Sequence, residues 1–155
     1  MATKIDVLRL LAVNRQAFWS ITLKNSADLM KTIVNEVWYP AIQPLMKVEG
    51  FVGALVFQPL TEPIIEHFAK NGDNGLGMDY TGGPLVTVDL DFQWNSTSGD
   101  DQILSIEEDI IAKSKTCAES RGLSHRYIDQ NYACIKRDVF AGCGPQSKAR
   151  LLKVQ

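Results

Sequence analysis

The sequence lacks most of the features that reveal a protein's function directly. Its 155 residues contain two histidines, His67 and His125, which lie far apart and match no metal-ligand spacing. There are three cysteines and no C-x-x-C pair, a pattern typical of free thiols in a reducing compartment. It contains no P-loop, no G-x-G-x-x-G, no G-x-S-x-G and no internal repeat. The sequence therefore predicts no metal site and carries no signature of a nucleotide-binding protein or a serine hydrolase.

An excess of positive charge and long hydrophobic runs are missing too. Lysine and arginine number 16, aspartate and glutamate number 18, and the net charge is -2. We therefore expect no nucleic-acid partner and no binding to an anionic membrane. No run approaches the roughly 20 apolar residues that cross a bilayer. Asp6 and Arg9 interrupt the apolar N-terminus and spoil a signal peptide, so the expected location is cytoplasmic.

The clearest positive signal is an unbroken alternation from Pro84 to Trp94. The apolar side consists of Val86, Val88, Leu90, Phe92 and Trp94, and the other side consists of Leu85, Thr87, Asp89, Asp91 and Gln93. A period of two with β-branched and aromatic residues predicts a strand inside a sheet. Two carboxylates and an amide on the second side indicate either a solvated sheet face or the wall of a wet cleft.

The same reasoning predicts the other elements. Residues 17–24 alternate as a strand, with Ser20 and Thr22 on its more polar side. Asn25-Ser26 predicts the N-cap of a helix with an apolar stripe, which Pro40 and Pro44 should end or kink. The continuous apolar run 51–58 predicts a strand that is covered on both faces. The remaining predictions are helices at 64–69, 102–121 and 147–154, a long loop at 71–83 and a last strand at 125–132.

This order of elements predicts the fold class. Strands and helices alternate through residues 1–155, which suit a single domain with a substantial core. We expect a two-layer α+β domain, with a mainly antiparallel four-stranded sheet and helices on one face. A parallel α/β sheet is the alternative, and the amphipathic third and fourth strands disfavour it.

Several segments, in the same order along the chain, resemble the fungal FAD-linked oxidoreductases related to berberine bridge enzyme. They are R-Q-A-F-W-S-I-T-L-K-N-S-A-D-L-M (15–30), V-E-G-F-V-G-A-L-V-F-Q-P-L (48–60), N-G-L-G-M-D-Y-T-G-G-P-L-V (74–86), and H-R-Y-I-D-Q-N-Y-A (125–133) followed by R-D-V-F-A-G-C-G (137–144). The resemblance implies that the chain corresponds to the family's substrate domain. The family's FAD-binding domain, with its glycine-rich pyrophosphate loop, has no counterpart in the sequence. Asp129 stands where the family has the first tyrosine of a Tyr-x-Asn motif, and Cys143 stands where a tyrosine is usual.

The resemblance also implies which residues form a site. In that family one face of the sheet packs on helices, and the other faces the flavin and the substrate. The face toward the substrate would carry Asp89, Asp91, Gln93, Tyr127, Asp129 and Asn131, together with Gln58, Ser20 and Thr22. Without a flavin domain something else must cover this face, and a second copy of the chain is the simplest cover. We therefore expect a homodimer.

Our first hypothesis is an enzyme of secondary metabolism that uses no cofactor. It would catalyse a non-redox step (cyclisation, isomerisation, dehydration or cycloaddition) on an aromatic or polyketide-like compound. Asp129 is the first candidate for acid or base, followed by Asp89 and Asp91, whose pKa values a partly buried cleft can separate. Tyr127 and Asn131 would donate hydrogen bonds to a carbonyl or enolate, and His125 is a reserve candidate.

Two alternatives come from other functional classes. The chain could be a binding protein that complements a separate flavoprotein, because an incomplete domain exposes a docking surface. It could also be a fragment of a flavin-dependent oxidoreductase, on the strength of the resemblance alone.

Overall fold

The chain folds around one four-stranded sheet, seen in a computed structural model that describes residues 14–69, 75–78, 82–134 and 136–153. The strands are β1 (Arg15–Lys24), β2 (Val52–Leu60), β3 (Leu85–Trp94) and β4 (Ser124–His125). Their order across the sheet is β2-β3-β1-β4, and every pairing between them is antiparallel. The alternating stretch is therefore an interior strand, as predicted.

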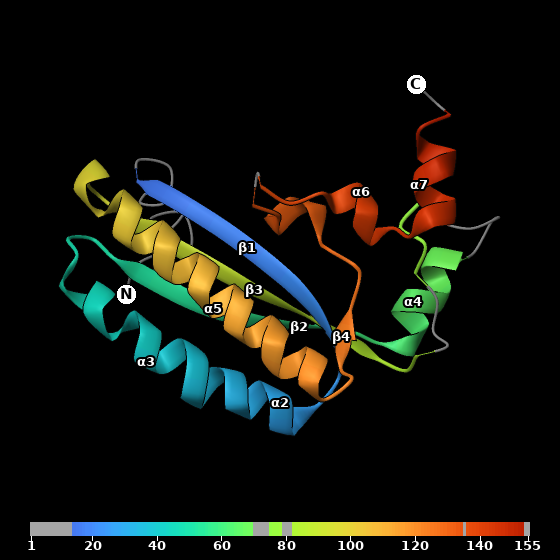
Figure 1. Cartoon of the computed structure of the whole chain (residues 1–155), viewed down its shortest axis with the longest axis horizontal. Coiled ribbons are helices and arrows are strands. Elements are labelled where there is room, and N and C mark those ends of the chain that lie inside the picture. Colours follow the sequence, from blue (N-terminus) through green and yellow to red (C-terminus); the bar gives the residue numbers. More distant parts are fainter. Residues whose placement is uncertain (1–13, 70–74, 79–81, 135, 154–155) are drawn as a thin grey trace, which may run out of the picture.

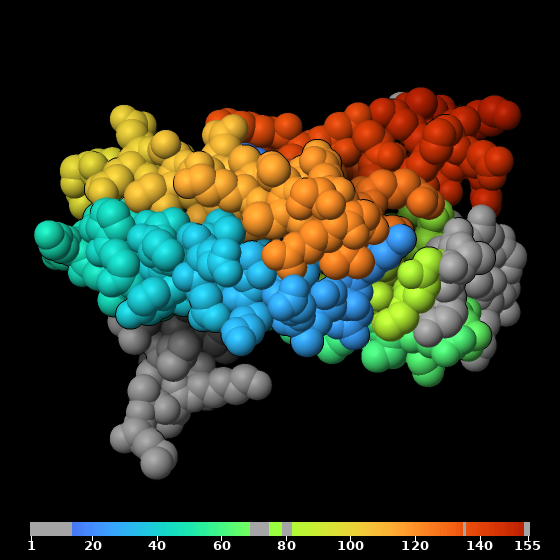
Figure 2. Space-filling view, turned by 60° about the horizontal axis from the view of Figure 1, so that its bottom comes forward, coloured from blue at the N-terminus to red at the C-terminus, as the bar shows by residue number. Residues whose placement is uncertain are grey.

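Helices cover one face of this sheet, which confirms the two-layer α+β prediction (Figure 1). The first group consists of α2 (Ala27–Thr32), a π-helical turn η1 (Ile33–Trp38), α3 (Tyr39–Ile42) and a 3-10 turn η2 (Gln43–Lys47). The second group consists of the 3-10 turn η3 (Thr97–Gly99) and the helix α5 (Asp100–Ser120). Figure 2 shows the two groups packed side by side. Between them and the sheet lies the main core, to which β3 contributes Val86, Val88, Leu90, Phe92 and Trp94.

The first helical group starts as predicted but does not end where predicted. Ser26 is the N-cap, and its side chain accepts a hydrogen bond from the amide of Leu29. The helical segment continues through Pro40 and Pro44 and ends at Lys47, so Pro40 does not end it, and the alternative of a kink at the prolines stays a prediction. The wider π-helical turn ends at Trp38, two residues before Pro40, and it includes the turn with which a proline ring would clash in a regular α-helix.

The prediction that the apolar strand 51–58 is covered on both faces is also wrong. β2 is an edge strand, and Val52 and Val56 are 59% and 40% exposed on the face opposite the helices. Pro59 lies inside the strand instead of ending it. An edge strand tolerates a proline because its outer side makes no ladder hydrogen bonds.

The predicted last strand at 125–132 is largely wrong. β4 contains only Ser124 and His125, and the chain then runs irregularly to a 3-10 turn, η4 (Gln130–Tyr132). The side chain of Asp129 caps this turn by accepting a hydrogen bond from the amide of Asn131 at 2.9 Å. Local capping by an aspartate competes here with strand pairing, so Tyr127, Asp129 and Asn131 do not share one face of a strand.

A smaller apolar cluster lies beyond one end of the sheet, where Figure 1 shows α4 and α7. Leu60, Ile65, Met78 and Leu85 form its centre, and the ring of Tyr127 packs against it. The helices in this part are α4 (Glu62–Ala69), α6 (Val139–Gly142) and α7 (Pro145–Leu151). Within the described ranges, no helix combines the length and hydrophobicity needed to span a membrane. The apolar N-terminus that Asp6 and Arg9 interrupt and most of the predicted loop 71–83 lie outside the described residues.

Candidate functional site on the polar face of the sheet

The face of the sheet that the helices do not cover carries most of the predicted site residues, and we call it the polar face. Strand pairing aligns its residues in rows that cross β1, β3 and β2. The rows are Gln16, Gln93 and Val52; Phe18, Asp91 and Ala54; Ser20, Asp89 and Val56; and Thr22, Thr87 and Gln58. The strand register therefore brings six of the predicted residues onto one surface.

One half of the polar face is buried by the chain itself, and we call it the covered half. Ser20, Thr22, Thr87 and Asp89 are each no more than 2% exposed. The segment 126–132 contributes to this cover, since the hydroxyl of Ser20 donates to the backbone carbonyl of Asp129 at 3.4 Å. In this half, residues of the same chain therefore cover the polar face of the sheet.

Asp89 is the most unusual group of the covered half. Its Oδ2 accepts a hydrogen bond from the hydroxyl of Thr87 at 3.3 Å, while its Oδ1 has no hydrogen-bond partner among the described residues. Burial, helped by the negative charges of Asp129 and Asp91, raises the pKa of Asp89 to about 6. A carboxyl with this pKa gains and loses a proton close to neutral pH, which suits an acid or a base.

The charge of Asp129 affects the pKa of Asp89, and the charge of Asp89 affects that of Tyr127, but Asp129 and Tyr127 each have other contacts. The carboxylate of Asp129 caps η4, so part of its hydrogen-bonding capacity is used locally. The ring of Tyr127 is half-buried, and burial, followed by the charges of Asp129, Cys143 and Asp89, raises its pKa to about 12. Tyr127 is therefore a neutral hydroxyl beside two carboxyls, able to donate a hydrogen bond.

The other half of the polar face is accessible and hollowed, and we call it the open half. A cavity of about 220 Å³ lies there, lined by Gln16, Phe18, Val52, Ala54, Asp91, Phe92 and Gln93. Burial raises the pKa of Asp91 above its ordinary value. Asp91 is thus the carboxyl of the polar face that borders open space, and Asp89 stands two residues away, about 7 Å along the strand.

The remaining predicted residues lie around this surface. Gln58 is exposed on β2 and pairs with Thr87 in the register. His125 pairs with Thr22, and its Nδ1 accepts a hydrogen bond from the amide of Tyr127 at 3.2 Å. Asn131 is exposed on η4. None of these three lines the open-half cavity.

Sequence reasoning missed one buried carboxyl, Glu107. It lies on the buried side of α5, 2% exposed, and its Oε1 has no hydrogen-bond partner among the described residues. Burial, helped by the charge of Asp91, raises its pKa to about 8. The signal was its spacing, because Glu107 falls four residues after Ile103 and three before Ile110 on one stripe.

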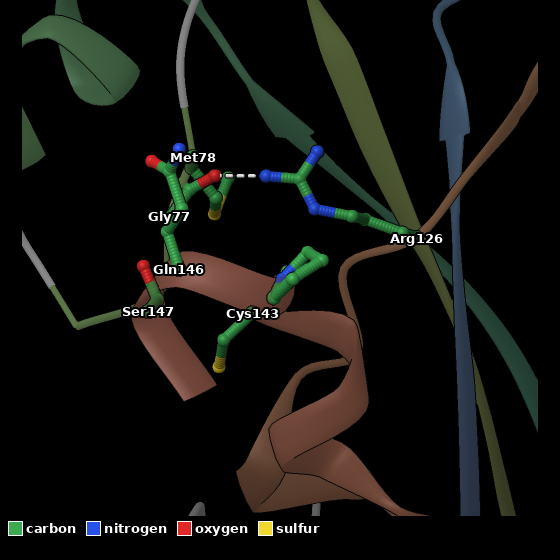
Figure 3. A pocket seen from close by; sticks show the side chains of 8 residues that line it. Gly77, Met78, Arg126, Cys143, Gln146 and Ser147 are labelled. Carbon is green, nitrogen blue, oxygen red and sulfur yellow. Dashed lines mark hydrogen bonds between the residues drawn. The ribbon is translucent and has the colours of Figure 1, made fainter. Parts of the chain in front are cut away.

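A second cavity of about 600 Å³ lies between α7 and the segment around Gly77 (Figure 3). Figure 3 shows the guanidinium of Arg126 reaching toward Gly77, whose carbonyl accepts a hydrogen bond from it. Cys143 and Ser147 line the same cavity, and Gly77 has a positive φ of 61°. A side chain at Gly77 would collide with the carbonyl of Cys143, so this glycine lets the two segments pack closely.

Neither cavity fits FAD as a whole. The described lining of the open-half cavity includes a carboxyl and no cationic side chain, so nothing there neutralises a diphosphate. Among the described residues that line the second cavity, Arg126 is the single cation, and its guanidinium already donates to Gly77. A flavin would have to be held by residues beyond the described ranges or by another polypeptide. Across the described residues, no group of histidine, cysteine and acidic side chains could hold a metal ion.

Comparisons with known proteins agree in part with the resemblance to fungal FAD-linked oxidoreductases. The chain is 28% identical over 145 residues to a protein of Fusarium proliferatum named FAD-dependent monooxygenase FUP4. It is 26% identical over 145 residues to a protein of Cochliobolus heterostrophus named FAD-dependent monooxygenase tpcD. Each match covers 91% of this chain and 28% of the relative, so the chain spans little more than a quarter of either protein. No family model matches the chain, and no solved structure matches it. The chain is therefore similar to one segment of two fungal proteins named as flavin-dependent enzymes.

Proposed function

We propose that the polar face binds a small organic substrate and that its carboxyls exchange a proton with that substrate. The observation that carries the proposal is the open-half cavity, which borders Asp91 directly and has Asp89 beside it on the same strand. The raised pKa values of both carboxyls support it. The similarity to segments of two enzymes supports an enzymatic role in small-molecule tailoring.

The two carboxyls take different roles in this proposal. Asp91 lines the cavity and contacts the substrate, so it accepts or donates the proton. Asp89 lies under the cover of residues 126–132, and the negative charge of Asp91 helps burial to raise the pKa of Asp89. Asp89 therefore keeps its proton up to about pH 6. Such a pair suits a step in which a proton leaves one atom of the substrate and returns to another, as in an isomerisation or cyclisation.

Deuterium incorporation tests this role even when the product is not identified. Aromatic ketones, enols and quinone methides are incubated with the protein in heavy water and analysed by mass spectrometry. We expect exchange at one carbon of an accepted compound, reduced about 100-fold in Asp91→Asn because general acid–base groups contribute about this much. Asp109→Asn, which removes an exposed carboxyl of α5, is the matched control and retains the exchange. Equal exchange in wild type and Asp91→Asn contradicts the proposal.

A second candidate is the substrate-binding part of a flavin-dependent monooxygenase. Its support is the printed name of both relatives, which this chain matches over 91% of its length. In this version the flavin is bound elsewhere and meets the substrate at the open half. An absorbance spectrum from about 300 to 550 nm, taken together with the mass in solution, distinguishes the versions. A flavin band favours the second version, whereas a colourless dimer favours the first and agrees with the predicted homodimer.

A further inference from the structure

The open-half cavity contains hydrogen-bond acceptors that lack donors. Oδ1 of Asp91 and Oε1 of Gln93 are buried and have no hydrogen-bond partner among the described residues. A buried acceptor without a donor costs about 1 to 3 kcal/mol. Both residues line the cavity, so a donor placed there by a ligand would remove this cost.

The spacing of the two acceptors sets the size of such a ligand. Asp91 and Gln93 are two residues apart on one strand face, which separates them by about 7 Å. The terminal torsions of aspartate and glutamine are broad, so each can turn an oxygen toward the cavity. Two donors would therefore have to sit at opposite ends of the ligand, further apart than neighbouring substituents on one ring.

The walls of the cavity set its shape and polarity. Phe18 from β1 and Val52 and Ala54 from β2 supply apolar surface on either side of β3. Phe18 and Val52 remain 37% and 59% exposed, so each has apolar area left to bury. The volume of about 220 Å³ lies below the range of roughly 300 to 1,000 Å³ typical of drug-sized ligands, so one or two fused rings fill it.

The charge of the cavity lining restricts the charge of the ligand. Asp91 is the one ionisable group among the described lining residues. An anionic ligand would meet this carboxyl with no cation to offset the repulsion. A neutral or cationic ligand with donor groups meets no such barrier.

We propose that the open half binds a flat, neutral or cationic molecule of one or two fused aromatic rings with hydrogen-bond donors at opposite ends. Phenolic hydroxyls or amine N–H groups would serve, one donating to Asp91 and the other to Gln93. This inference rests on the proposed function for the location of the site, and it names the class of substrate.

Binding of a matched set of probes tests the proposal. The set contains a naphthalenediol with hydroxyls at opposite ends of the rings, its dimethyl ether, and a naphthol carboxylate. Affinity is measured by calorimetry and by chemical-shift changes at Phe18 and Val52. The diol should bind about tenfold more tightly than the ether, because two hydrogen bonds are lost in the ether. The carboxylate should bind more weakly than the diol.

Variants show which acceptors are used. Gln93→Met keeps the length of the side chain but lacks the amide, and it should weaken diol binding about five- to tenfold while leaving ether binding unchanged. Gln102→Met, on an exposed position of α5, is the matched control and should change neither affinity. Dispersed amide resonances in each variant establish that it is folded.

The outcomes separate this inference from the proposed function. If diol and ether bind equally, if neither binds, or if Gln93→Met weakens both equally, the substrate class is wrong. Deuterium exchange that depends on Asp91 would still support the proposed function in each of these cases. Tight, Gln93-dependent binding of the diol without Asp91-dependent exchange of any accepted compound would uphold the substrate class and contradict the proton transfer.

Discussion

Glu107 and Asp89 are two buried carboxyls that lie on opposite sides of the same sheet. Each is 2% exposed, and each has one oxygen without a hydrogen-bond partner among the described residues. Burial raises the pKa of Glu107 to about 8 and that of Asp89 to about 6. Glu107 lies on the helix side, on a stripe of α5 with Ile103, Ile110 and Ile111. Asp89 lies on the polar side, beside Thr87 and near Asp91, Asp129 and Tyr127.

This difference shows that burial by itself does not make a site. Burial accounts for most of the raised pKa of Glu107, and the described cavities are not lined by it. Asp89 adds a hydrogen bond, two neighbouring carboxyls and a cavity two residues away. Functional chemistry depends on such neighbours and on access for a substrate. Asp91 connects the two faces, since its charge raises the pKa of both groups.

The largest expected effect is on stability, and it differs between two neighbouring residues of β3. Leu90 is fully buried on the helix side, whereas Asp91 borders the cavity on the polar side. Leu90→Ala should lower the free energy of unfolding by about 4 kcal/mol, because it removes core contacts and leaves a void. Asp91→Asn should change it by less than about 1 kcal/mol. Urea unfolding of both variants checks the contrast, and similar losses would show that the two faces are equally important for stability.

Glu107→Gln should give the next largest effect, and the size of this effect depends on pH. The unfolded chain releases the Glu107 proton near its ordinary pKa of 4.5, whereas the folded chain holds it up to about 8. The free energy of unfolding therefore falls as the pH rises between these values. Glutamine has no proton to lose, so the variant should be about 4 kcal/mol more stable than wild type at pH 8.

At about pH 3, where the glutamate is protonated in both the folded and the unfolded chain, this difference should almost disappear. Urea unfolding at several pH values checks the prediction. A difference that stays constant with pH would show that the carboxyl is not the cause.

Asp89→Asn should act in the same direction but less strongly. The pKa of Asp89 rises from its ordinary 3.8 to about 6 on folding. The free energy of unfolding therefore falls as the pH rises between these two values. The variant should be about 3 kcal/mol more stable than wild type at pH 7. It should also lose deuterium exchange, whereas Glu107→Gln should keep it. A variant that gains stability and keeps full exchange would make Asp89 structural, like Glu107.

The smallest expected effect lies on the exposed edge of β2. Val52 lines the open-half cavity and Val56, on the same face, does not. Val52→Thr and Val56→Thr should each change the free energy of unfolding by no more than about 0.5 kcal/mol, because both positions are exposed. Val52→Thr alone should weaken binding of the naphthalenediol, by roughly threefold. Equal weakening in both variants would move the binding surface away from the cavity.

The sequence predicted the sheet well where residue alternation decided the structure. The strand from Leu85 to Trp94, its interior position and its polar side all follow from a period of two. The placement of Asp89, Asp91 and Gln93 on one face follows from the same pattern. Ser20 and Thr22 join them because β1 alternates in the matching register.

Features set by the competition between local hydrogen bonds, strand pairing and tertiary packing could not be predicted. Asp129 caps a 3-10 turn instead of extending a strand, because a local hydrogen bond to Asn131 wins over pairing. The apolar character of β2 suggested burial on both faces, but nothing among the described residues packs over Val52. The burial of Glu107 could not be predicted because a glutamate on a helix is almost always on its outer side.

The measurement that tests the central claim most directly is a carbon-13 NMR titration of the aspartate carboxyls from about pH 2 to 9. Asp89 should titrate with a midpoint near 6, and Asp91 should titrate above its ordinary value of 3.8. Addition of the naphthalenediol should then shift the Asp91 resonance while leaving that of Asp109 on α5 unchanged. Midpoints near 3.8 for both Asp89 and Asp91, with no response to the diol, would contradict a proton-exchanging site on the polar face.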